Sequence, residues 1–153
     1  AEEVDYLGHR ITAGGVAPLP SRVQAVADFP RPTVKRELQG FLGMVNFYRR
    51  FLRGAASILR PLTDATRGGG GKTSPVTWTA EMEAAFLAAK QALATAATLA
   101  HPDGDAELAL AFDASDHHVG GVLQLRPSPS HPWRPFVLFQ QQADQYRAPL
   151  LHF

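Results

Sequence analysis

The sequence predicts an α+β fold in which helices and an antiparallel sheet occupy successive parts of the chain. Apolar residues recur at three- and four-residue steps over 34–53 and 80–97, a spacing typical of helices with one buried face. Short apolar runs separated by turn residues follow at about 107–113, 118–125 and 135–139, and they predict strands. We therefore expect a helical unit first and a small sheet after it.

The first part of the chain predicts a hairpin and one short helix. Residues 6–11, followed by 14–16, have the composition of two short strands with a glycine turn. Ser21 is a suitable N-cap for a helix that runs to about Phe29, and the prolines at 30 and 32 then stop it.

The strongest helical pattern covers residues 34–53, and we expect Thr33 to cap it. Gly40 and Gly43 lie inside it, although each glycine is about 1 kcal/mol less favourable than alanine in a helix interior. A glycine that is tolerated there usually marks the close approach of another group.

One face of this helix has the character of a nucleic-acid contact. Its members fall at i, i+4, i+7 and i+8, and they are Gln39, Gly43, Asn46 and Phe47. Amides, a flat ring and a glycine gap suit a helix laid along a shallow minor groove, where shape and sugar contacts matter more than base identity. Nearby basic residues would contact phosphates, namely Arg49, Arg50 and Arg53. The alternative is an ordinary core helix with a polar rim, and composition alone favours it.

The middle of the chain predicts two more helices around a flexible segment. A short helix over 54–65 contains Pro61, and the four consecutive glycines within 67–75 indicate a linker. Thr79 is the expected N-cap of the long helix, whose first turn carries Glu81 and Glu83, where the helix dipole favours acids.

Composition limits the classes of function that the chain can have. Its 153 residues suffice for one ordinary domain or two small ones, and the absence of cysteine excludes disulfides and thiolate metal sites. No apolar run is long enough to span a bilayer, so we expect no membrane partner. The formal charge of +1 hides +6 over residues 31–67 and −6 over 81–116. This split predicts a basic surface for a polyanion, and two solvated faces that attract each other are an equally ranked alternative.

Asp113 stands at the end of a strand of small and apolar residues, directly before a turn, and a second strand follows Gly120. Several metal-dependent nucleases hold their first metal ligand in this way. An aspartate at a strand end is more often only a turn-former, so this signal is weak without further support.

The order of these segments resembles the Pol polyprotein of gypsy-type LTR retrotransposons, well over residues 6 to about 125 and weakly to 146. The resemblance is carried by Tyr6-Leu7-Gly8-His9, by Leu38-Gln39-Gly40-Phe41-Leu42-Gly43-Met44-Val45-Asn46-Phe47-Tyr48-Arg49-Arg50-Phe51 and by Asp113-Ala114-Ser115-Asp116. Shorter matches lie at 15–16, 29–33, 61–63, 78–79, 85–86, 90–93 and 120–123. The resemblance implies the end of a reverse transcriptase palm at 1–17, a thumb-like helical unit at 18–66, a linker at 67–77, and a connection helix with an incomplete RNase H-like domain at 78–153.

The resemblance also implies roles for particular residues. Leu7, Gly8 and His9 correspond to the primer grip, and Asp113 to the first of four carboxylates that hold two Mg²⁺ ions. The second carboxylate is expected near Tyr146, where residues 147–150 contain no acid, and the usual end of the third strand is replaced by Phe139 and three glutamines. We expect Mg²⁺ to serve the parent enzyme and not to bind tightly to this chain, because one carboxylate cannot hold two metal ions.

Three hypotheses of function follow. In the first, the chain is a segment of a reverse transcriptase and RNase H, binds a template–primer as an RNA–DNA hybrid or DNA duplex together with the rest of the Pol polyprotein, and does not catalyse hydrolysis by itself. In the second, it is a non-catalytic nucleic-acid-binding relic. In the third, it is a relic without a role.

Overall fold

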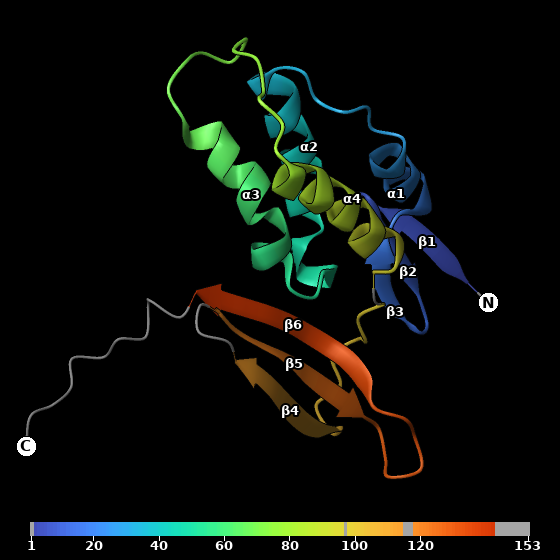
Figure 1. Ribbon diagram of the computed structural model, residues 1–153. Coiled ribbons are helices and arrows are strands. Elements are labelled where there is room, and N and C mark those ends of the chain that lie inside the picture. Colours follow the sequence, from blue (N-terminus) through green and yellow to red (C-terminus); the bar gives the residue numbers. More distant parts are fainter. Residues whose placement is uncertain (1, 97, 115–117, 143–153) are drawn as a thin grey trace, which may run out of the picture.

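A computed structural model describes residues 2–96, 98–114 and 118–142 of the chain, and it confirms the α+β fold (Figure 1). Helices gather on one side of the molecule, the N-terminal sheet flanks them, and the C-terminal sheet lies beneath them. In chain order the elements are β1 (Glu3–Tyr6), β2 (His9–Thr12), β3 (Gly15–Pro18), α1 (Pro20–Ala27), α2 (Lys35–Phe47), the 3₁₀ helix η1 (Arg49–Phe51), α3 (Ala55–Arg67), α4 (Ala80–Ala94), β4 (Glu107–Ala114), β5 (His118–Arg126) and β6 (Arg134–Gln142).

The N-terminal sheet has the order β1-β2-β3, with antiparallel pairs throughout. The residues 6–11 that we expected to form one strand contain a tight turn, because Tyr6 pairs with His9 and both turn residues have positive φ, 47° at Leu7 and 80° at Gly8. Two left-handed residues fit the right-handed twist of a two-residue hairpin, although this conformation is costly for a leucine. The hairpin tip is therefore a strained feature.

The third strand of this sheet is fixed to the segment that follows α4. Val16 and Leu99 exchange two backbone hydrogen bonds of 2.8 Å each. A Cβ atom at Gly15 would lie 2.1 Å from the carbonyl oxygen of Leu99, so only glycine allows this approach. The pairing joins the start of the chain to its second half.

Helix α2 is shorter than the sequence predicts and begins differently. Val34, not Thr33, is its N-cap, and the Glu37 carboxylate accepts hydrogen bonds from the Thr33 amide (2.7 Å) and hydroxyl (3.0 Å). The helix ends at Phe47 rather than near residue 53, and the tighter turn η1 follows. This change of pitch lets Tyr48 and Phe51 both be buried, at 3% and 1% exposure.

The glycine-rich segment that we predicted as a linker runs beside the start of α2. Backbone amides of Lys35, Arg36 and Val76 donate to carbonyls of Ser74, Lys72 and Thr33, at 2.8 to 3.0 Å. Beyond it, α4 begins at the predicted cap, since the Thr79 hydroxyl accepts from the Met82 amide at 3.2 Å. Helix α4 packs in the same core as α2 and α3, so the segment does not separate two cores. The functional boundaries at residues 17, 66 and 77 stay predictions.

The Lys35 side chain caps the C-terminal end of α3. It is 9% exposed, and its Nζ donates to the carbonyl oxygens of Gly68 (2.6 Å) and Gly69 (2.8 Å), which follow the last turn of that helix. We expect Lys35→Met to lower the free energy of unfolding by about 1–3 kcal/mol, because two carbonyls lose a charged donor. Urea denaturation measures this change. Arg36→Met, at the exposed next position, is the control and should leave the midpoint nearly unchanged.

The C-terminal sheet has the order β4-β5-β6, again antiparallel, with a bulge beside Leu123 and Gln124. Strand β6 is longer than expected and lies nearest the helices (Figure 1), where Leu138 packs against the core. On β4 three apolar side chains stay exposed, Leu108 (61%), Leu110 (49%) and Phe112 (68%). No helix in the described part of the chain is long and apolar enough to cross a membrane.

Candidate nucleic-acid interface

The hairpin tip and the end of α2, which the sequence indicated separately, are in contact. The Tyr48 hydroxyl donates to the carbonyl oxygen of Gly8 at 2.7 Å. A Cβ atom at Gly8 would lie 3.0 Å from that hydroxyl and 3.2 Å from the Phe47 ring, so the glycine permits the contact. The His9 ring centroid lies 5.4 Å from that of Phe47 and 5.6 Å from that of Tyr48. The predicted grip residues therefore lie against the predicted helix face.

A groove of about 1040 Å³ lies between the hairpin and α2, and we call it the hairpin–helix groove. Of the residues predicted from the sequence, Leu7, Gly8, His9, Gly43, Phe47 and Arg50 line it. Four others do not line it, namely Gln39, Asn46, Arg49 and Arg53, although all four are exposed. The remaining lining residues are Tyr6, Ile11, Val16, Arg22, Val26, Gly40, Met44 and Tyr48.

The two glycines of α2 leave part of the helix surface at the groove without side chains. No heavy atom lies within 4 Å of a Cβ built at Gly40 or Gly43, apart from the neighbours and backbone of the helix itself. The fold therefore does not need glycine for space at either position. Phe47, at 57% exposure, stands beside this open stretch as a flat apolar surface.

Two polar side chains, His9 and Tyr48, line the hairpin–helix groove. His9 Nδ1 lies 3.0 Å from the carbonyl oxygen of Leu7, and its buried Nε2 has no hydrogen-bond partner among the described residues. Burial raises the pKa of the Tyr48 phenol above its ordinary value of 10, with the Arg22 charge opposing the rise. Tyr48 therefore stays protonated at neutral pH and keeps its hydrogen bond to the hairpin.

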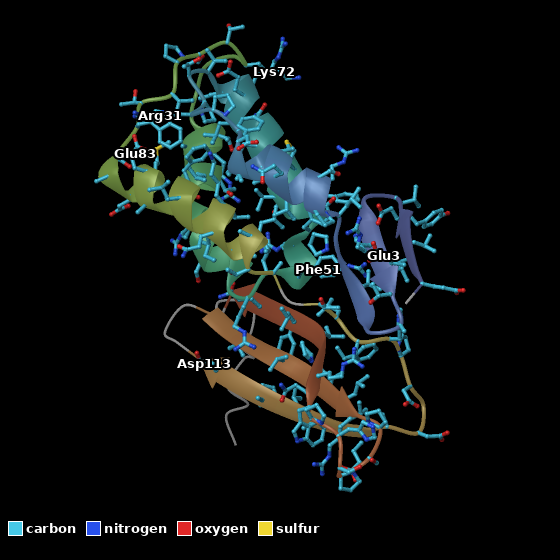
Figure 2. All side chains as sticks on the ribbon, turned by 90° about the vertical axis from the view of Figure 1, so that its right-hand side faces the viewer. Glu3, Arg31, Phe51, Lys72, Glu83 and Asp113 are labelled. Carbon is cyan, nitrogen blue, oxygen red and sulfur yellow. The ribbon has the colours of Figure 1, made fainter. Side chains whose placement is uncertain are left out.

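The arginines fall into two groups. Five of them have carboxylate partners: Arg10 with Glu3 and Asp5, Arg31 with Glu83, Arg60 and Arg67 with Asp64, and Arg126 with Glu107. Figure 2 shows Arg31 and Glu83 together at one end of the helices, far from Phe51. No carboxylate of the described residues lies within salt-bridge distance of Arg22, Arg49, Arg50 or Arg53. Four arginines without a carboxylate partner thus lie at the groove or shortly after α2, and among the other described arginines Arg36 and Arg134 also lack one.

Sequence reasoning missed Arg22 and Tyr48 as members of this site. Arg22 lies on α1, which the sequence pattern identified only as a short helix. Tyr48 fits the apolar repeat of the helix predicted over residues 34–53, and it was therefore expected in the core. The feature that identifies Tyr48 is the hydrogen bond from its hydroxyl to the strained Leu7–Gly8 turn. Because this bond joins residues far apart in the sequence, no local pattern could indicate it.

Asp113 lies on the C-terminal sheet, away from the hairpin–helix groove (Figure 2). It is exposed and lines a smaller hollow of about 230 Å³ together with Arg53, Gly54 and residues of β5 and β6. Asp116 and residues 147–150 lie outside the described part of the chain. Within that part, no group of three or more His, Cys, Asp or Glu side chains could hold a metal ion.

Comparisons with known proteins place the chain in a family. Residues 78–147 match the RNase H-like domain found in reverse transcriptase. The chain is 35% identical over 128 residues to the retrovirus-related Pol polyprotein from transposon opus of Drosophila melanogaster, covering 79% of this chain and 13% of that protein. It is 34% identical over 148 residues to the Gag-Pol polyprotein of avian reticuloendotheliosis virus, covering 96% and 12%. The chain belongs to the retroelement Pol family.

The gypsy polyprotein of the same fly is among the relatives, at 32% identity over 136 residues, and the resemblance seen in the sequence is thereby confirmed. The Pol chain described here spans only about an eighth of the length of these polyproteins. A solved structure of a foamy viral protease-reverse transcriptase in complex with dsDNA has the same fold. Its TM-score is 0.78 at 23% identity, over 93% of this chain and 29% of that one. Another, with an RNA/DNA hybrid, has a TM-score of 0.74 at 24% identity, over 92% and 18%.

Proposed function

We propose that this Pol chain binds the duplex of a template–primer, as an RNA–DNA hybrid or a DNA duplex, across the hairpin–helix groove. The observation that supports this most is the position of the unpaired arginines. Arg22 and Arg50 line the groove and Arg49 precedes Arg50 in the chain, and none of the three has a carboxylate partner among the described residues, whereas five of the other arginines do. An exposed, uncompensated basic surface attracts a polyanion.

The shape of α2 supports a duplex as the ligand. Gln39, Gly43 and Asn46 present amides and a flat gap on an exposed face, and such a face can follow a wide and shallow minor groove. The arginines would position the phosphates, which carry no sequence information. The foamy viral proteins of the same fold were solved with dsDNA and with an RNA/DNA hybrid, which supports the same class of ligand here.

Polymerase and RNase H activities are proposed for the longer Pol polyprotein, with the rest of that polyprotein as the partner of this chain. The RNase H-like family generally uses Mg²⁺. The described carboxylates do not fit a two-metal site, because Asp113 is the one carboxylate in its hollow. We therefore assign no metal-dependent step to the described residues of this chain.

The substitution Gly43→Leu is expected to weaken hybrid binding without lowering the stability of the fold. A Cβ atom at this position has nothing within 4 Å beyond its chain neighbours and the helix backbone, and leucine replaces a poor helix former, so stability should rise by about 0.5–1 kcal/mol. The same side chain would occupy the space into which a duplex must come, so we expect the Kd for an RNA–DNA hybrid to rise at least about tenfold, or about 1.4 kcal/mol.

Fluorescence anisotropy with a labelled hybrid measures the Kd, and thermal unfolding measures the stability. Gln91→Leu is the matched control, because Gln91 is an exposed residue of α4 that does not line the hairpin–helix groove. An unchanged Kd in Gly43→Leu would show that the duplex does not contact this face of α2.

A further inference from the structure

The carbonyl oxygen of Gly8 joins three elements that are far apart in the sequence. Gly8 lies in the turn between β1 and β2. Its oxygen accepts a hydrogen bond of 2.7 Å from the hydroxyl of Tyr48, the residue that ends α2, and one of 3.0 Å from the amide of Leu19, the residue that precedes α1. The tip of the β1–β2 hairpin is therefore attached to the starts and ends of two helices through one backbone atom.

The tip of this hairpin has a conformation that its own sequence does not favour. Leu7 has a φ of 47°, which residues other than glycine, asparagine and aspartate rarely adopt. Its side chain is 71% exposed, so packing of that side chain contributes little to holding the turn. A strained backbone of this kind persists only where the surrounding structure fixes it, and such strain is concentrated at functional sites. The contacts of Gly8 are therefore what keeps the turn in place.

The Tyr48 hydroxyl is the contact that sets the position of the tip relative to α2. The Tyr48 side chain is 3% exposed, and its ring centroid lies 4.9 Å from that of Phe47 and 6.4 Å from that of Phe51. The ring is thus held by its neighbours in α2 and η1. Leu19 directly follows β3 and belongs to the same side of the hairpin–helix groove as the hairpin itself. The bond from Tyr48 connects that side to the helix on the other side.

We propose that Tyr48 is a positioning residue for duplex binding, whose hydroxyl holds the strained Leu7–Gly8 turn against α2 and so gives the hairpin–helix groove its binding shape before a duplex arrives. The hydroxyl acts through the turn and not by contact with the duplex. A protein that has its binding shape only part of the time loses affinity by that fraction, so a fixed turn binds more tightly. This proposal rests on the proposed function, because the duplex in the groove is the ligand for which the turn is positioned.

Tyr48→Phe removes the hydroxyl and keeps the buried ring. The Gly8 carbonyl keeps the Leu19 amide as a donor, so no acceptor loses all its partners and the variant should fold. The turn should then leave its strained conformation for part of the time, and we expect the Kd for an RNA–DNA hybrid to rise about fivefold. The slope of log Kd against log salt should stay that of the parent, because no phosphate contact is lost. Fluorescence anisotropy over a salt series measures both quantities.

Thr66→Val is the matched control for the loss of a hydroxyl. The Thr66 hydroxyl also donates to a backbone carbonyl at 2.7 Å, that of Thr63, but Thr66 lies on α3 and does not line the groove. Its removal should lower the melting temperature by a similar amount and leave the Kd unchanged.

Leu7→Asn provides a rescue, because asparagine followed by glycine is the preferred sequence for a two-residue hairpin turn with two positive φ angles. In this background the turn holds its conformation by local preference and needs the Tyr48 hydroxyl less. Adding Tyr48→Phe to Leu7→Asn should therefore raise the Kd by less than about twofold.

The positioning role is overturned if Tyr48→Phe leaves the Kd unchanged or alters the salt slope. It is overturned equally if Thr66→Val weakens binding as much, or if the loss is the same in the Leu7→Asn background. If Gly43→Leu weakens binding while Tyr48→Phe does not, the proposed function stands without this role for Tyr48. If Gly43→Leu binds the hybrid normally, the proposed function fails and the positioning role fails with it.

Discussion

Replacement of Arg49, Arg50 and Arg53 together by glutamate should lower the affinity of this Pol chain for an RNA–DNA hybrid by at least about two orders of magnitude at low salt. None of the three is paired with a described carboxylate, so their full charge is available to phosphates. The loss should be the same for every hybrid sequence, because phosphate contacts do not read bases. The slope of log Kd against log salt should fall by about three, one for each phosphate contact that is lost.

The matched control is the replacement of Arg31, Arg60 and Arg67 by glutamate, which changes the net charge of the chain equally. These three arginines are exposed but paired, Arg31 with Glu83 and the other two with Asp64. We expect them to affect hybrid binding far less. Equal losses in both variants, measured by anisotropy over a salt series, would mean that the overall field binds the duplex and that the arginines near the groove have no special part.

Local chemistry explains which elements could be predicted from the sequence. The cap at Thr79, the helix with Pro61 and the strand that carries Asp113 depend on residues close in sequence, and all of these elements are present. The strained turn at Leu7 was missed because a leucine at positive φ is rare and gives no local signal. The end of α2 was placed too late, because burial of Phe51 in the tertiary core overrides the helical period.

The candidate site could be predicted in parts but not as a whole. The residues of the hairpin and of the α2 face were each identified, since glycines and amides at helical spacing are visible in the sequence. The two sets of residues line one groove because the Tyr48 hydroxyl donates a hydrogen bond to the carbonyl oxygen of Gly8, forty residues away along the chain. The hydrogen bond from the Ala56 amide, at the start of α3, to the Gln140 side chain spans an even greater separation, and no pattern of nearby residues could indicate it.

Phe41→Ala should lower the free energy of unfolding of this chain by about 3–5 kcal/mol. The ring is fully buried, and its centroid lies 4.6 Å from that of Phe86 and 5.4 Å from that of Phe29. Removal of the ring leaves a cavity where α2, α4 and the end of α1 meet, and rigid neighbours fill such a cavity only in part. Since a small domain is stable by about 5–15 kcal/mol, the variant should lose a large part of its total stability.

Phe47→Ala is the comparison variant for Phe41→Ala, because the two phenylalanines lie on the same helix and only Phe41 is buried. Phe47 is 57% exposed and lines the hairpin–helix groove, so its removal should cost little stability and should instead weaken hybrid binding. Urea denaturation should show a lower midpoint for Phe41→Ala at an unchanged slope, and nearly the parent midpoint for Phe47→Ala. If Phe47→Ala lost as much stability as Phe41→Ala, its contacts with His9 and Tyr48 would serve to hold the hairpin on α2 rather than to bind a duplex.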